Sequence, residues 1–437
     1  MDRPNILYLH SHDTGRYVQP YGYAVPAPNL QRLAEQGVIF RQAFCTNPTC
    51  SASRASLLTG QWPHNSGMTG LAHRGWGLND YGHHVVRTLG RNGYYTALCG
   101  VQHVASHQEP GVRKTIGYDD IVGESTEHQG ELDEMAAAFL HDAPRQPFFL
   151  SVGFGDTHRD FREPGPQENP NYCRPPDPIP DTPETRRDMA GFMAEARVLD
   201  ARMGRVLDAL EETGLAENTL VICTTDHGIA FPRMKCNLYD AGIAVMLIMR
   251  GPGGFTGGRA VDALVSQVDI FPTLCALLGI DPPDWLQGVS FMPVMRGEAE
   301  EVREELFAEV NYHAAYEPMR CVRTKRWKYI RRFDDRGRPV LPNCDDSPTK
   351  QLWMDCGWVQ MPLPREELFD LTFDPHEANS LMDDPRGEEA LADMRERLDR
   401  WMRETNDPLL SGPVPAPAGG RANDPDGVSP REEPRVL

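Results

Sequence analysis

Histidine and aspartate residues follow four short apolar stretches whose length and residue types are typical of buried strands. These stretches, with the residues that follow them, are 6–9 (His12, Asp13), 96–99 (His103), 148–152 (His158) and 220–223 (Asp226, His227). One such residue alone is usually a helix cap or a surface group. Because open α/β sheets build their sites at the carboxyl ends of strands, four strand ends of this kind predict a common site. Two aspartates and two histidines could bind a divalent cation through oxygen and nitrogen, and the other histidines could contact an anion.

Cys50 and Arg54 form a second feature, at the expected start of a helix. A cysteine at that position faces unpaired backbone N–H groups and the positive end of the helix dipole, with Arg54 one turn further on. Such a position can hold an anion and activate a nucleophile. Taken alone, however, a cysteine of this kind is more often a small buried apolar residue, so the chemistry of Cys50 depends on what lies around it.

Short apolar runs alternate with helical segments along the first part of the chain, which indicates an α/β fold. A fifth strand is expected at residues 245–249. The clearest helix covers residues 183–213, where apolar residues recur every three or four positions. Thr182 can cap this helix, and Gly214 can end it. A shorter helix is expected at residues 29–36.

The composition changes near residue 297, where a charged segment (297–305) is expected to be a connector or a helix. Beyond it, the pattern predicts three strands and one helix, at residues 320–324, 327–331, 367–371 and 388–404. We therefore expect a larger domain of residues 1–297 that carries the chemistry, a smaller α+β domain of residues 298–410, and a tail. The tail, residues 411–437, is rich in Pro, Gly, Asp and Arg and is expected to be extended.

The charge of the chain excludes two classes of partner. Its 44 Lys+Arg residues against 63 Asp+Glu residues give a net charge of −19, which argues against binding to nucleic acid or to an anionic membrane surface. No apolar run is long enough to span a bilayer, and the first residues lack a signal-peptide pattern, so we expect a cytoplasmic protein. The 10 cysteines are too dilute for a disulfide framework, and none lies in a CxxC zinc pattern.

Residues 50–60, Cys-Ser-Ala-Ser-Arg-Ala-Ser-Leu-Leu-Thr-Gly, resemble the sulfatase signature C-x-(P or A)-S-R-x-x-x-L-T-G. Other stretches follow the order of the same family, at residues 4–13, 93–103, 147–158, 225–228, 269–274 and 367–379. The resemblance covers roughly residues 4–405. Within the family, the chain looks most like the heparan N-sulfatase (N-sulfoglucosamine sulfohydrolase) branch, on residues 61–70, 154–159, 231–239 and 401–408.

This resemblance implies an alkaline-phosphatase-like fold, with a large mixed sheet between helices and a smaller antiparallel sheet towards the C-terminus. It also implies that a maturation enzyme converts Cys50 to formylglycine, which supplies the nucleophile, and that the site holds one divalent metal ion, usually Ca²⁺. By motif position, the metal ligands are His12, Asp13, Cys50 (as formylglycine), Asp226 and His227. The matching catalytic residues are Cys50, Arg54 for the formylglycine or sulfate oxygens, His103 for the proton of the nucleophile, and His158 with Lys235 for the sulfate and the leaving group.

The chain departs from the family pattern at four places. His12 and His227 stand where the family usually has an aspartate and an asparagine, and this softer donor set favours Mn²⁺ or a similar ion over Ca²⁺. Gln102 replaces the usual lysine, so it could donate a hydrogen bond to sulfate but adds no charge. Ala52 replaces the commoner proline, so conversion of Cys50 depends on which maturation system the host has.

The leading hypothesis is an enzyme that hydrolyses a sulfate ester or sulfamate on a small carbohydrate such as N-sulfoglucosamine. Because the pair Asp226-His227 also resembles phosphonate monoester hydrolases of the same superfamily, a phosphonate monoester or phosphodiester hydrolase is the alternative. A relative that binds an anion or sugar without turnover is a third possibility. A strongly acidic protein should repel long polyanions, so we expect a pocket for one sulfated end, with His73 and His107 as candidates for its mouth. The sequence leaves the oligomeric state open.

Overall fold

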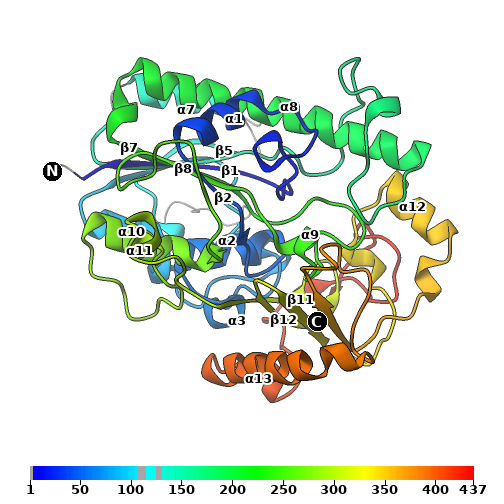
Figure 1. Cartoon of the computed structure of the whole chain (residues 1–437). Coiled ribbons are helices and arrows are strands. Elements are labelled where there is room, and N and C mark those ends of the chain that lie inside the picture. Colours follow the sequence, from blue (N-terminus) through cyan, green and yellow to red (C-terminus); the bar gives the residue numbers. More distant parts are fainter. Residues whose placement is uncertain (1–2, 107–114, 125–129, 143) are drawn as a thin grey trace.

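A mixed β-sheet of 8 strands runs through the protein, with helices on both faces (Figure 1). The computed structural model describes residues 3–106, 115–124, 130–142 and 144–437. From one edge to the other, the strands are β5 (Asp120–Glu124), β4 (Tyr95–Gly100), β6 (Phe148–Gly153), β1 (Asn5–Ser11), β7 (Thr219–Thr225), β8 (Leu247–Arg250), β2 (Val38–Phe40) and β9 (Arg259–Val261). The strands from β5 to β7 run parallel to one another, whereas β8 is antiparallel to both of its neighbours. The predicted α/β class and the five predicted strands are confirmed.

Helices cover both faces of this sheet because alternate side chains of its strands point to opposite sides. The helices on one face are α1 (Pro28–Gln36), α7 (Leu132–His141) and α8 (Pro183–Glu212), and those on the other include α2 (Cys50–Thr59), α4 (Val85–Arg91) and α10 (Ile270–Leu278). Leu7 and Leu9 of β1 pack against the first group, and Ile6 and Tyr8 pack against the second. The strands are therefore apolar on both faces, which explains why their sequences read as continuous apolar runs.

The helix α8 begins as the sequence predicts. Thr182 and Thr185 form a capping box, in which each side chain bonds the backbone of the other residue, and Pro183 occupies the first turn. The shorter helix α1 spans Pro28–Gln36, and its end at Gly37 is also as predicted. The remaining α-helices that lie wholly within the described parts of the chain are α3 (Pro63–Ser66), α9 (Asp240–Ile243), α11 (Met292–Met295), α12 (Pro348–Asp355) and α13 (Glu388–Glu404). None of the described helices is both long and apolar enough to cross a membrane.

A second sheet of 4 antiparallel strands packs beside the first. Its strands, in order, are β11 (Glu305–Tyr312), β12 (Tyr316–Thr324), β13 (Trp327–Arg332) and β14 (Glu366–Asp370). The helix α13 covers one face of this sheet and confirms the helix predicted at residues 388–404. The other face of the sheet packs into the core of the larger sheet. The strand β11 was not among the predicted strands, and no helix forms over residues 297–305. Because β11 is buried on both faces, it lacks the polar alternation that marks a half-exposed strand.

The tail packs on the body of the protein and is largely irregular. Two short strands, β15 (Arg421–Ala422) and β16 (Arg435–Val436), pair with each other near the C-terminus. A further two-stranded pair, β3 (Ala43–Phe44) with β10 (Val265–Ser266), lies in the larger part. Arg74 donates hydrogen bonds to Asn423 Oδ1 at 2.5 Å and to the carbonyl of Pro430 at 3.3 Å, and Ala422 is buried. These contacts join the tail to the 3-10 turn at Ala72–Arg74.

Asn343 links two loops that reach towards the strand ends of the larger sheet. Its Nδ2 donates to Glu317 Oε2 at 2.8 Å, and its Oδ1 accepts from the backbone N–H of Ala315 at 2.8 Å. Ala315 lies in the β11–β12 turn beside His313, and Asn343 lies two residues before Asp345. The orientation of these two loops therefore depends on a buried glutamate at the start of β12.

The ionisation of Glu317 should make stability depend on pH. Burial raises the pKa of its carboxyl from 4.5 to about 7, although the bond from Asn343 lowers it. Between those values the unfolded chain releases a proton that the folded protein keeps, so the free energy of unfolding falls as pH rises. Glu317→Gln removes this loss, and we expect the variant to gain about 3 kcal/mol over the wild type between about pH 4.5 and pH 7.5.

Thermal unfolding of both proteins across this pH range measures the difference. A stability gap between the variant and the wild type that stays constant with pH would contradict this assignment for Glu317.

Candidate functional site

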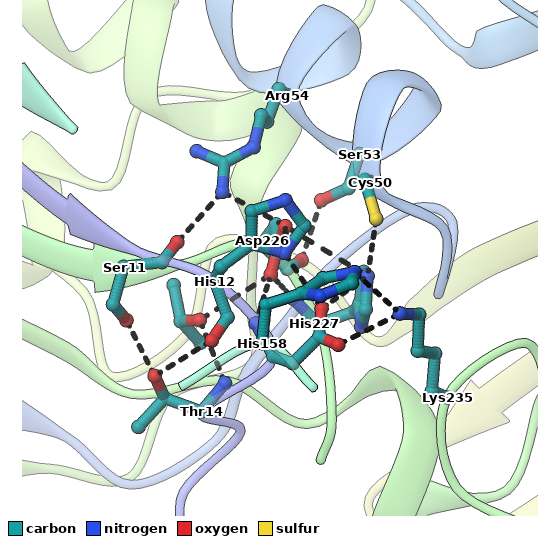
Figure 2. A network of polar contacts seen from close by, with 12 residues as sticks. Ser11, His12, Thr14, Cys50, Ser53, Arg54, His158, Asp226, His227 and Lys235 are labelled. Carbon is teal, nitrogen blue, oxygen red and sulfur yellow. Dashed lines mark hydrogen bonds and ion pairs between the residues drawn. The ribbon is translucent and has the colours of Figure 1, made fainter. Parts of the chain in front are cut away.

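The carboxyl ends of β4, β6, β1 and β7 lie at one edge of the sheet, because these strands are neighbours in that order and all run parallel. His103 follows β4, His158 follows β6, His12 and Asp13 follow β1, and Asp226 and His227 follow β7. Cys50 begins α2, and Lys235 comes from the loop between β7 and α9. Figure 2 shows the side chains of a shared cluster, which includes His12, Cys50, Arg54, His158, Asp226, His227 and Lys235. The structure thus brings the predicted site residues together.

Two buried carboxylates form the centre of the cluster. The backbone N–H of Asp13 donates to Asp226 Oδ1 at 2.8 Å. His12 Nδ1 lies 2.8 Å from Asp13 Oδ1 and 3.2 Å from Asp226 Oδ2. Burial alone would raise the pKa of Asp13, but Lys235 and the nearby histidines lower it well below its usual range. Both carboxyl groups are therefore anionic at neutral pH, since the positive groups beside Asp226 lower its pKa as well.

His227 is oriented as a ligand would be. Its Nδ1 lies 3.0 Å from the carbonyl of Gly228, so the Nδ1 proton is donated to that carbonyl and Nε2 is left with a lone pair. Nε2 lies 3.4 Å from Asp13 Oδ1 and 3.5 Å from Cys50 Sγ. Within the described residues, Asp13, Cys50, Asp226 and His227 each offer a donor atom within 4.8 Å of the others. This set of oxygen and nitrogen donors fits a divalent cation.

A second group of donors overlaps the first and consists of His12, Asp13, Cys50 and His158. His12 therefore lies close enough to share an ion with Asp13, as predicted from its position. The two groups have Asp13 and Cys50 in common, so the donors surround one location rather than two. A cation there would be adjacent to the side chain of residue 50.

Cys50 occupies the first position of α2, after Thr49 in an extended conformation. Burial raises the pKa of the Cys50 thiol well above its usual value, despite the nearby Lys235. The unmodified side chain is therefore held as a protonated thiol, which is a weak nucleophile. Ser53, one turn along, donates to the backbone carbonyl of Asp226 at 2.5 Å and so ties α2 to the end of β7.

Arg54 is buried and held by three groups. Its Nη2 donates to Asp226 Oδ2 at 2.9 Å and to the carbonyl of Ser11 at 2.8 Å (Figure 2). Its Nη1 lies 2.5 Å from His10 Nδ1. His10 was not among the predicted site residues, although a histidine within an apolar strand was a usable signal. Burial lowers the pKa of His10 well below its usual value, so this neutral ring accepts a hydrogen bond from Arg54.

Lys235 and His158 form a close pair. Lys235 Nζ donates to Asp13 Oδ2 at 2.8 Å and lies 3.4 Å from His158 Nε2. His158 Nδ1 lies 2.5 Å from the carbonyl of Arg159, which fixes the ring with Nε2 towards Lys235. Burial alone would lower the pKa of Lys235, but Asp13 and Asp345 raise it well above its usual value. The pair therefore carries an ammonium group beside an imidazole that can share its proton.

His103 and Gln102 lie in the loop after β4. His103 is an edge-on neighbour of His12, with ring centroids 5.2 Å apart. Burial and the nearby His12 lower its pKa well below the usual range, so its ring is neutral. Gln102 does not act as expected, because its amide bonds the backbone of Val104 and Ala105 at 2.7–2.9 Å. The side chain that replaces the usual lysine therefore shapes its own loop and is not free to bind sulfate.

Asp345 and His313 also lie near the site, and no sequence pattern pointed to them. Asp345 Oδ2 is 3.0 Å from Lys235 Nζ, and its side chain is 15% exposed. His313 is buried, and Lys235 and Asp345 are among the charges that affect its pKa. Both residues come from the region after residue 297, and they approach the strand ends only through tertiary packing. A local motif could not have identified them.

A cavity of about 680 Å³ opens onto the strand ends. His12, His103 and His158 line it, and His73 lies there as expected for a residue at the mouth. His107 lies outside the described residues. The charged residues around the cavity are Asp156, Arg159, Asp160, Arg162, Glu195 and Arg202. Most of these are paired with each other or with neighbours, as Arg202 is with Asp156 at 2.7 Å, so the wall has little net charge.

Comparisons with known proteins agree with this geometry. A family model described as "Sulfatase" matches residues 4–280, and a model described as "N-sulphoglucosamine sulphohydrolase, C-terminal" matches residues 227–350. The human N-sulphoglucosamine sulphohydrolase is 30% identical, over 94% of this chain and 92% of that protein. An "Ulvan-active sulfatase" of Formosa agariphila is 28% identical, over 93% of this chain and 76% of that protein.

Solved structures share the fold. A putative sulfatase yidJ from Bacteroides fragilis superposes with a TM-score of 0.76 at 18% identity, covering 94% of this chain and 98% of that one. A protein solved in complex with its substrate D-glucosamine-2-N,6-O-disulfate superposes with a TM-score of 0.75, also at 18% identity, covering 93% and 98%. Since the sulfatase model matches more than half of the chain and the human relative covers nearly all of it, this protein belongs to the sulfatase family.

Proposed function

We propose that this protein hydrolyses a sulfate ester or sulfamate on a small sulfated carbohydrate, using formylglycine made from Cys50 and one divalent metal ion. The observation that carries the proposal is the position of residue 50. Its Sγ lies 3.5 Å from His227 Nε2, in the donor cluster that also contains Asp13 and Asp226. A nucleophile at this position would be next to the cation and next to the Lys235–His158 pair.

The names of relatives support a carbohydrate substrate. The human relative is named as an N-sulphoglucosamine sulphohydrolase, and another, from Bacteroides thetaiotaomicron, is named as a Delta 4,5-hexuronate-2-O-sulfatase. The second of these is 26% identical, over 95% of this chain and 92% of that protein. One name describes sulfamate hydrolysis and the other describes sulfate ester hydrolysis, so the proposed substrate class includes both.

The residues of this chain have separable roles in the proposed reaction. A metal ion held by Asp13, Asp226 and His227 would withdraw charge from the sulfo group, and formylglycine would supply the attacking oxygen. Arg54, which Asp226 and His10 hold in place, fixes the geometry around residue 50. Lys235 binds a sulfo oxygen, and the Lys235–His158 pair delivers a proton to the departing atom. His103, a neutral imidazole, takes the proton from the nucleophile.

A small substrate suits the charge distribution. The chain carries a net charge of −19, yet the cationic side chains of Arg54 and Lys235 lie within the donor cluster, where a bound cation would add positive charge. Long sulfated polymers would meet the negative surface first, whereas one sulfated end can enter the pocket. We propose a terminal sugar or short oligosaccharide as the substrate and a formylglycine-generating enzyme as a transient partner.

Mass spectrometry of residue 50, combined with sulfate release, tests the proposed function. We expect active protein to contain formylglycine at position 50, and Cys50→Ala to lose roughly 10³-fold or more in activity because it removes the nucleophile. Aryl sulfate, glucosamine N-sulfate and a phosphonate monoester are the substrates to compare. Active protein in which Cys50 remains a thiol would overturn the mechanism, and a preference for the phosphonate would favour the alternative hydrolase.

Metal addition tests the proposed ligands. We expect Mn²⁺ at about 100 times its dissociation constant to raise the unfolding temperature of metal-free protein by roughly 3 °C. The same concentration of Ca²⁺ should raise it less, because a histidine ligand favours the softer ion. Asp226→Asn should abolish this response. Asp200→Asn is the matched control, because Asp200 is a buried carboxylate that bonds the backbone at the start of α1 and lies outside the donor cluster. A full response in Asp226→Asn would show that the ion binds elsewhere.

A further inference from the structure

Asp345 lies next to the groups that would deliver a proton to the leaving atom. Its Oδ2 is 3.0 Å from Lys235 Nζ, and Lys235 Nζ is 3.4 Å from His158 Nε2. Within the described parts of the chain, Asp345 Oδ2 is buried and has no hydrogen-bond partner beyond this ion pair. Burial opposes its charge, but Lys235 and His158 lower the pKa of Asp345 to about 2. A charged acceptor with unused hydrogen-bonding capacity therefore lies beside the proton donors.

The loop that carries Asp345 is held firmly. Lys350 Nζ donates to the carbonyl of Cys344 at 2.7 Å and to Asp346 Oδ1 at 2.9 Å. Ser429 of the tail donates to Asp346 Oδ2 at 2.5 Å, and Asn343 is bonded to Glu317. The residues on both sides of Asp345 thus have structural partners, whereas within the described residues the Asp345 side chain is held by its ion pair with Lys235. The loop therefore holds the Asp345 carboxylate in place without using it for the loop's own hydrogen bonds.

Lys235 does not need Asp345 for its charge to be balanced. Asp13 already accepts a hydrogen bond from Lys235 Nζ at 2.8 Å. A second buried carboxylate 3.0 Å from Lys235 Nζ costs free energy, because it loses solvent and is repelled by Asp13. A purely structural role for Asp345 would not offset this cost. An acceptor held at such a cost is expected to meet a donor on the substrate.

We propose that Asp345 is a specificity-determining residue that accepts a hydrogen bond from the nitrogen of a sulfamate substrate. This inference rests on the proposed function and narrows its substrate class to N-sulfated amino sugars. The nitrogen that carries the sulfo group has one N–H, whereas the bridging oxygen of a sulfate ester has only lone pairs. Asp345 therefore attracts the first and repels the second.

The same contact favours the departure of the amine. Before the sulfur–nitrogen bond breaks, the nitrogen lone pair takes a proton from the Lys235–His158 pair. The nitrogen then carries a positive charge, which an adjacent carboxylate stabilises, until the bond breaks with its electron pair on nitrogen and a neutral amine leaves. A bridging ester oxygen is far less basic and does not carry a full positive charge before its bond to sulfur breaks, so the carboxylate gives it no comparable assistance.

The test compares two substrates of the full-length protein in which Cys50 has been converted to formylglycine. We expect Asp345→Asn to lower kcat/KM for glucosamine N-sulfate by about 10- to 100-fold, and to change kcat/KM for an aryl sulfate by less than about threefold. Asp346→Asn is the matched control, because it removes a carboxylate from the same loop that does not contact Lys235. We expect Asp346→Asn to change kcat/KM by a similar factor for both substrates.

Equal losses on both substrates would show that Asp345 only holds Lys235 in place, and no loss on either would show that it has no role. A wild type that hydrolyses the aryl sulfate but not glucosamine N-sulfate would overturn this inference and leave the proposed function standing. Binding of glucosamine N-sulfate to Cys50→Ala provides a readout without turnover. There, adding Asp345→Asn should weaken affinity by about 10-fold, and unchanged affinity would contradict the contact.

Discussion

Two carboxylates, Asp13 and Asp226, are buried together at the ends of adjacent parallel strands, and the rest of the site compensates for their charge. Like charges in a low-dielectric interior repel strongly, so each oxygen needs a positive or hydrogen-bonding neighbour. Arg54 and a backbone N–H satisfy Asp226, while Lys235 contacts Asp13. The imidazole Nε2 of His227 faces both carboxylates, at 3.4 and 3.8 Å, and completes a place for a cation.

This constraint explains why elements far apart in the sequence meet where they do. The register between β1 and β7 sets Ser11 against Thr225 and so brings the residues that follow them together. The helix α2 must then begin beside these ends, because it supplies both Cys50 and Arg54. Lys235 also forms an ion pair with Asp345, which lies in the loop between β13 and α12. The C-terminal part thus contributes directly to the chemistry of the site as well as to the core.

The sequence was informative where chemistry and local pattern coincide. Strands that are buried on both faces gave apolar runs, and the residues after them could be assigned to one edge because parallel strands share it. Residue 50 was identifiable from a continuous motif on one helix. By contrast, β11 has no alternation to detect, Asp345 and His313 lie in irregular loops, and the role of Gln102 depends on backbone groups of its own loop. Such features arise from tertiary packing, which a single sequence does not encode in any local spacing.

The central claim is that the strand-end carboxylates hold a cation beside residue 50. Anomalous diffraction from crystals of the full chain grown with Mn²⁺ tests it most directly. The account predicts one strong anomalous peak in contact with Asp13, Asp226 and His227 and adjacent to residue 50. A fully occupied ion bound elsewhere, with Lys235 and Arg54 alone balancing the two carboxylates, would contradict it.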